Sequence, residues 1–208
     1  RFCVVNKRLT WCGAVNTRLS EGMRRAAIRE HGGYKLLTKF CDYDGMSNYI
    51  RPRTSGATIF FTVNLANRTS DLLVREVDKL RDAFMRTLAD RKFNIDAIVV
   101  MPDHLHAVIT LPENDHDYAT RWGVIKGRFS RQIGKGDLRD SNLRRRERGV
   151  WQRRYWEHHI RDEDDYRAHV EYCWKNPVKH GYVEMPSDWP YSSIHRDIRL
   201  GRVSKEWQ

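Results

Sequence analysis

The chain has 208 residues, with 38 Lys or Arg against 27 Asp or Glu, a formal net charge of +11 and an isoelectric point near 9.7. The composition, with 40% hydrophobic residues and seven Trp, nine Tyr and seven Phe, excludes a disordered protein. It predicts one domain with a packed core. The positive charge favours a polyanionic partner, most simply nucleic acid, with a ribosome or a membrane surface as alternatives. No apolar run approaches the roughly 18 residues of a spanning helix, so we expect no membrane segment.

The first 45 residues hold three of the four cysteines and little periodicity. The cysteines lack the paired spacing of a zinc site, and the sequence resembles no secretory signal, so we expect a reduced, cytoplasmic protein without disulfides. We interpret residues 1–45 as an extension upstream of a true start at Met46, and residues 46–208 as a single domain. The alternative is a basic arm that contacts nucleic acid.

Residues 57–65 are rich in β-branched and aromatic side chains, which predicts a first strand. Apolar residues then recur at helical spacing over 71–91, which predicts a long amphipathic helix. Two more strands are predicted over 93–101 and 104–111, separated by a turn at Pro102–Asp103. We expect these two strands to pair in an antiparallel manner.

A second helix is predicted over 116–133, and a fourth strand over 150–160. Acidic residues at 162–165 favour the start of a further helix, which should stop near Asn176 because Pro177 disfavours helical geometry in the residue before it. An irregular aromatic tail follows. The order strand, helix, strand, strand, helix, strand is typical of an α+β fold, a ferredoxin-like sandwich with a mainly antiparallel sheet.

His104 and His106 flank one apolar residue in the third strand. Side chains of a strand alternate between its faces, so the two imidazoles should stand side by side. Neutral histidine is a common metal ligand, and this pair would suit a divalent cation. The alternative is two histidines on the surface of a half-buried strand.

Tyr172 and Asn176 are four residues apart on the last predicted helix and therefore share a face. If that helix crosses the histidine pair, a phenol, an amide oxygen and two imidazoles converge, as a metal-assisted attack on a phosphodiester requires. A structural role for Tyr172 is the alternative. Tyr166 and Tyr155 are rival nucleophiles.

Two stretches resemble a known family. Met101–His106 followed by an apolar strand resembles the HUH motif of the single-tyrosine transposases of insertion sequences. Residues 172–181 and 189–193 resemble the C-terminal signature of the REP-associated tyrosine transposases. The resemblance runs from Met46 to Ser193 and leaves residues 1–45 unmatched.

The resemblance implies an HUH nuclease fold and cleavage and joining of single-stranded or hairpin DNA, such as repetitive extragenic palindromes. It implies Mg²⁺ or Mn²⁺ held by His104, His106 and Asn176, with Tyr172 as the nucleophile. Related insertion-sequence enzymes place Gln where Asn176 stands. The resemblance also implies a cytoplasmic, nucleoid-associated bacterial protein, either a monomer or a homodimer.

Basic side chains of the second helix and the following loop are expected to contact phosphates, with one aromatic side chain stacking on bases. They are Arg121, Lys126, Arg128, Arg131, Arg144, Arg145, Arg146 and Trp151. The alternatives are a solvated loop for the arginine run and core packing for Trp151. Two other functions compete with transposition: a hairpin-binding protein that has lost cleavage, and an RNA-binding module of similar fold.

Overall fold

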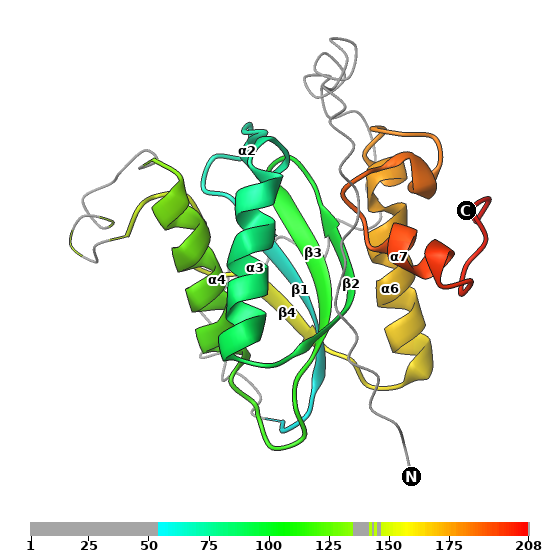
Figure 1. Cartoon of the computed structure of the whole chain (residues 1–208), viewed down its shortest axis with the longest axis horizontal. Coiled ribbons are helices and arrows are strands. Elements are labelled where there is room, and N and C mark those ends of the chain that lie inside the picture. The colour runs from blue at the N-terminus through cyan, green and yellow to red at the C-terminus, as the bar shows by residue number, and fades with distance from the viewer. Residues whose placement is uncertain (1–53, 135–141, 143, 145–146, 208) are drawn as a thin grey trace, which may run out of the picture.

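The computed structural model describes residues 54–134, 142, 144 and 147–207, with four strands in one antiparallel sheet (Figure 1). The strands are β1 (Thr58–Asn64), β2 (Asn94–Val100), β3 (His104–Thr110) and β4 (Trp156–His159). Their order is β2-β3-β1-β4, and every neighbouring pair is antiparallel. This arrangement confirms the predicted α+β sandwich.

One face of the sheet is covered by the helices that precede α6 (Figure 1). They are α2 (Leu72–Arg75), α3 (Val77–Asp90) and α4 (Tyr118–Gln132). The odd-numbered residues of β1, Ile59 to Val63, point to this side and pack with Trp122 and Phe129. These three β1 side chains are fully buried, and this layer contains more buried hydrophobic residues than the core on the other face.

The other face is covered by α6 (Glu163–Lys179), which packs against β2 and β3 (Figure 1). Phe60, Val99 and Val108 of the sheet contact Cys173 and Trp174 in this second core. Because strand residues alternate, the face that bears Val108 also bears the even-numbered histidines of β3. The α6 helix therefore lies over the histidine pair.

The C-terminal tail closes the open edge of the sheet at β2. It contains a short 3₁₀ helix, η2 (Pro186–Asp188), and α7 (Ile194–Arg199). Between them the Val100 amide donates to the Tyr191 carbonyl over 2.9 Å, and the Ser193 amide donates to the Ile98 carbonyl over 2.8 Å. The aromatic and serine residues of the tail thus supply the partners that an edge strand lacks.

Three predicted boundaries were wrong. The helix expected over 71–91 is interrupted at Glu76, whose φ of −111° and ψ of 30° are not helical. The strand expected over 150–160 covers only Trp156–His159, with Trp151 reduced to an isolated bridge to Leu65. Tertiary contacts account for the shorter strand, since Trp151 and Tyr155 pack against α4 instead of continuing the ladder.

The last helix does not stop at Asn176 but continues through Pro177 to Lys179. Proline removes one backbone donor, and here the loss falls in the final turn, where few helical bonds remain to be broken. Pro177 is buried, and its carbonyl accepts a hydrogen bond from the Tyr182 amide over 2.9 Å. The helix begins as predicted, with the Asp162 side chain accepting from the Asp165 amide.

The predicted extension, residues 1–45, and the proposed start Met46 lie outside the described residues, as do Arg145 and Arg146. Within the part of the chain that the structure describes, no helix is long and apolar enough to cross a membrane.

Candidate functional site

The two histidines of β3 stand side by side under α6, as the strand alternation predicts. Their ring centroids are 4.9 Å apart and the rings are nearly perpendicular. His104 is 5% exposed and His106 is 4% exposed. The pair is therefore a buried feature of the sheet face and not a pair of surface histidines.

Asp103 and Arg68 fix the orientation of His104. The His104 Nδ1 lies 2.7 Å from an Asp103 carboxylate oxygen, and the Arg68 Nε lies 2.8 Å from the other oxygen. Burial alone raises the pKa of Asp103, but the hydrogen bond from His104 and the positive charge of Arg68 outweigh it and leave the pKa lowered. An ionised carboxylate only accepts hydrogen bonds, so His104 carries its proton on Nδ1 and keeps Nε2 for a ligand.

Thr62 and Phe60 of β1 fix the orientation of His106. The His106 Nδ1 lies 2.9 Å from the Thr62 hydroxyl, opposite it in the strand register. The imidazole stacks on Phe60 at 5.5 Å with an interplanar angle of 15°. Burial lowers the pKa of His106 well below its ordinary value, and the neighbouring His104 lowers it further. His106 is therefore neutral at neutral pH, the form that binds metals.

Tyr172 projects from α6 onto this pair. Its ring meets His106 edge-on at 5.1 Å and Phe60 at 5.7 Å. The Lys179 ammonium, two turns later on α6, lies 5.1 Å from the centre of the tyrosine ring. A positive charge near a phenol favours the phenolate form.

The rival tyrosines lie elsewhere. Tyr155 packs with Phe61 and Trp122 on the opposite face of the sheet. Tyr166 lines a cavity between α6 and the C-terminal tail together with Trp174. Neither ring contacts the histidine pair among the described ring contacts, whereas Tyr172 does.

Asn176 lies one turn after Tyr172 on the same helix and is 1% exposed. Neither its carbonyl oxygen nor its amide nitrogen has a hydrogen-bond partner among the described residues. An unsatisfied buried amide is costly and is retained where a ligand uses it. An amide oxygen and two imidazoles are donors that a hard or borderline divalent cation accepts.

His180, which the sequence assigned a surface or structural role, is exposed and lies beside the site. Its ring lies 5.5 Å from that of His104, just beyond the end of α6. Partial burial of the ring, with His104 and the Lys179 ammonium nearby, lowers the pKa of His180 to about 4. His180 and Lys179 both fall in the stretch 172–181 that carries the family resemblance, and this was the signal for them in the sequence.

The α4 residues that were expected to contact DNA lie across the sheet from this site. Two of them already bond to other residues of the chain. Arg121 is buried, and its guanidinium donates to both oxygens of Asp115, at 2.6 and 3.0 Å, and to two backbone carbonyls. Arg128 bonds to Asp90 and, over 3.1 Å, to the Thr87 hydroxyl. These contacts give both arginines a structural role, because Arg121 ties α4 to the loops at Asp115 and Lys92, and Arg128 ties it to the end of α3.

The remaining predicted contacts differ in exposure. Lys126 donates to the Gln152 carbonyl over 2.6 Å and lies over the rings of Trp151 and Tyr155. Trp151 packs on Phe129, so core packing accounts for its ring. Arg131 and Arg144 are exposed and remain predicted phosphate contacts.

Known proteins are similar to this chain in sequence. The family described as "Transposase IS200 like" matches residues 59–173, which include both histidines and Tyr172. A Haemophilus influenzae protein assigned to the REP-associated tyrosine transposases is 46% identical over 165 residues, which is 78% of this chain and 93% of the relative. The REP-associated tyrosine transposase of Escherichia coli K12 is 45% identical over 162 residues, 78% of this chain and 91% of the relative.

A solved structure agrees with the sequence comparisons. It is the structure of a REP-associated tyrosine transposase bound to a REP hairpin, 44% identical to this chain with a TM-score of 0.68. The match covers 78% of this chain and 92% of the other. The chain belongs to the IS200-like transposase family, in its group of REP-associated tyrosine transposases.

Proposed function

We propose that the chain cleaves and rejoins single-stranded DNA at hairpins, with Tyr172 as the nucleophile and a divalent cation at His104, His106 and Asn176. The observation that carries the proposal is that Tyr172 of α6 meets the oriented imidazole of His106 edge-on, while Asn176, one turn later on the same helix, is buried with an amide that has no partner among the described residues. A phenol beside an oriented histidine, brought together from two elements far apart in sequence, supports a shared chemical role.

Three ligands are proposed for the cation, which is Mg²⁺ or Mn²⁺. They are Nε2 of His104, Nε2 of His106 and the side-chain oxygen of Asn176. Asp103 and Thr62 would act as the outer partners that hold ligating imidazoles in place. When bound, the ion would polarise the scissile phosphate and offset charge on its oxygens.

Tyr172 would perform the covalent step. Its phenolic oxygen attacks phosphorus, forming a tyrosine–phosphate bond to the 5′ end while the bond from phosphorus to the 3′ oxygen breaks. The phenol proton leaves to solvent, and the departing 3′ oxygen gains one, so a free 3′ hydroxyl remains. A phenol has a pKa near 10 in water, so an attack at neutral pH requires a nearby cation or base.

Hairpin DNA is the proposed substrate because the relative of known structure is described as bound to a REP hairpin. The net charge of +11 supports a nucleic-acid partner independently. The exposed arginines Arg131 and Arg144 remain proposed phosphate contacts, and their contribution should fall steeply as salt rises.

The decisive experiment incubates the native chain and a Tyr172→Phe variant with labelled hairpin DNA and Mn²⁺, followed by a denaturing gel. Phenylalanine keeps the ring packing on Phe60 and His106 and removes only the attacking oxygen. We expect a covalent protein–DNA adduct with the native chain and none with the variant. Tyr166→Phe, on the same helix, is the matched control and should keep the adduct.

An adduct that persists in Tyr172→Phe would contradict the assignment of the nucleophile. If the native chain retards several hairpins on a native gel yet never cleaves them with Mn²⁺ or Mg²⁺, the protein binds hairpins without cutting. That outcome would replace the proposed function with the binding-only alternative.

A further inference from the structure

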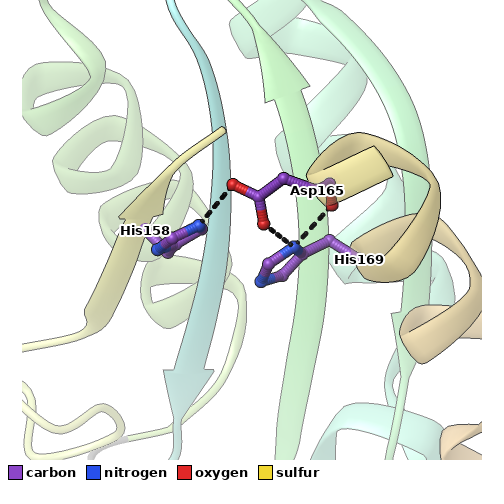
Figure 2. Close-up of side chains that lie close together, drawn as sticks. All are labelled: His158, Asp165 and His169. Carbon is purple, nitrogen blue, oxygen red and sulfur yellow. Dashed lines mark hydrogen bonds and ion pairs between the residues drawn. The ribbon is translucent and has the colours of Figure 1, made fainter. Parts of the chain in front are cut away.

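A second cluster of potential metal ligands lies where β4 meets the start of α6 (Figure 2). His158 comes from β4, and Asp165 and His169 come from α6. The His158 Nε2 lies 2.8 Å from one oxygen of Asp165, and the His169 Nδ1 lies 3.1 Å from the other. Figure 2 shows the carboxylate between the two imidazoles, with one oxygen facing each ring.

The local structure brings these three side chains together. Asp165 and His169 are four residues apart and share a face of α6. His158 pairs with Phe60 in the strand register, so it points to the side of the sheet that α6 covers. The two imidazoles stack on each other at 4.7 Å with an interplanar angle of 17°.

The carboxylate in the cluster is buried and charged. The Asp165 side chain is 8% exposed, against 27% for His158 and 21% for His169. Burial alone raises the pKa of Asp165, but hydrogen bonds from His158 and Arg161 outweigh it and lower the pKa to about 2. A fixed anion between two imidazoles is therefore present at neutral pH.

We propose that His158, Asp165 and His169 form a second divalent-cation site, suited to a transition ion of the Zn²⁺ class. Each side chain offers one ligand atom, and these atoms all lie within 4.8 Å of one another. Zn²⁺ binds nitrogen and oxygen at about 2.0–2.2 Å, which places neighbouring ligand atoms roughly 3.3 Å apart in a tetrahedral site. Each imidazole nitrogen lies close to that distance from its own carboxylate oxygen, at 2.8 Å for His158 and 3.1 Å for His169, and the His169 Nδ1 also lies 2.8 Å from the Asp165 carbonyl oxygen.

The two sites are separate. The Phe60 ring lies between them, stacked on His106 at 5.5 Å and 4.8 Å from the His169 ring. A cation in the second site would tie β4 to the first half of α6. Because His169 and Tyr172 are three residues apart on α6 and both contact Phe60, this link would hold the helix that carries the proposed nucleophile.

The test is the zinc content of the full chain after equilibrium dialysis against buffered Zn²⁺, with a paired His158→Gln/His169→Gln variant. We expect the variant to bind about one ion fewer than the native chain, because it loses two of the three ligands at one site. Cysteines that also bind zinc contribute equally to both proteins and cancel in the difference. His116→Gln removes an exposed histidine and should lose nothing.

Two further proteins complete the design. His158→Gln alone substitutes no residue of α6 and should also lose about one ion. This single variant keeps the test valid if the paired variant fails to fold in the presence of chelator. His104→Ala/His106→Ala should retain the ion of the second site whether or not it still cleaves DNA, so failure of the proposed function is distinguishable. Equal zinc in the native chain and in both His158 variants would overturn the proposal.

Discussion

Replacing Asn176 with leucine should make the metal-free protein more stable and abolish its metal-dependent activity. The Asn176 side chain is 1% exposed, and neither polar atom has a partner among the described residues. A buried amide left unpaired costs roughly 1–3 kcal/mol relative to a satisfied one. Leucine carries no polar atom, so Asn176→Leu removes this cost at the same point of α6.

The expected net gain follows from two opposing effects. Removing the unpaired amide contributes roughly 1–3 kcal/mol, whereas the larger leucine side chain strains a packed site by about 1–1.5 kcal/mol. The balance is a stabilisation of about 1 kcal/mol, which raises the melting temperature by about 2–4 °C for a chain of this size. Cation binding should weaken at the same time because one of three proposed ligands is lost.

The assay is thermal unfolding with chelator and again with Mn²⁺, followed by the hairpin cleavage reaction. Asn176→Leu should melt higher than the native chain in chelator and respond less to Mn²⁺. Asn176→Asp supplies a charged oxygen at the same place and should keep the Mn²⁺ response while melting lower in chelator. If Asn176→Leu melts lower than the native chain in chelator and still responds fully to Mn²⁺, the proposed ligand role is refuted.

Three other changes have defined outcomes. Arg121→Met should destabilise the fold by about 3–5 kcal/mol in urea unfolding, because Asp115 and two carbonyls lose a buried partner, while the hairpin affinity of the folded protein stays unchanged. Thr62→Val removes the hydroxyl beside His106 and should weaken Mn²⁺ binding about 10-fold in a titration. The folded-state pKa of Asp165, about 2, lies below its ordinary value, so its stabilisation is present above pH 4 and lost as the pH falls toward 2. At pH 6 in chelator, the free energy of unfolding of the native chain should therefore exceed that of Asp165→Asn by about 1–2 kcal/mol. A difference in unfolding free energy that grows below pH 4 would contradict this reasoning.

The sequence by itself determined the fold class and the candidate nucleophile. Alternation along 104–111 placed His104 and His106 on one face, and helical spacing placed Tyr172 and Asn176 on another. Both are local periodicities, which depend on a few neighbouring residues and are therefore legible without the structure. The order of the elements then limited the topology to the ferredoxin-like sandwich that is observed.

Predictions from local patterns were wrong where contacts with distant segments determine the end of a helix or strand. Pro177 was expected to end its helix at Asn176, yet the helix continues because packing and the Tyr182 amide stabilise its last turn. The predicted fourth strand shrank to Trp156–His159 because residues before it pack over α4. In both cases burial outweighs a local preference of a few kcal/mol.

The tertiary structure alone decided what surrounds each charged or polar side chain. The positive charge of the sequence indicates a nucleic-acid partner, but only the fold reveals that the Arg121 guanidinium bonds to the Asp115 carboxylate. The sequence likewise gives no sign that His158 meets Asp165 and His169 across β4 and α6. Such partners are set by how strands and helices pack, because groups far apart along the chain become neighbours only when the sheet and its covering helices close.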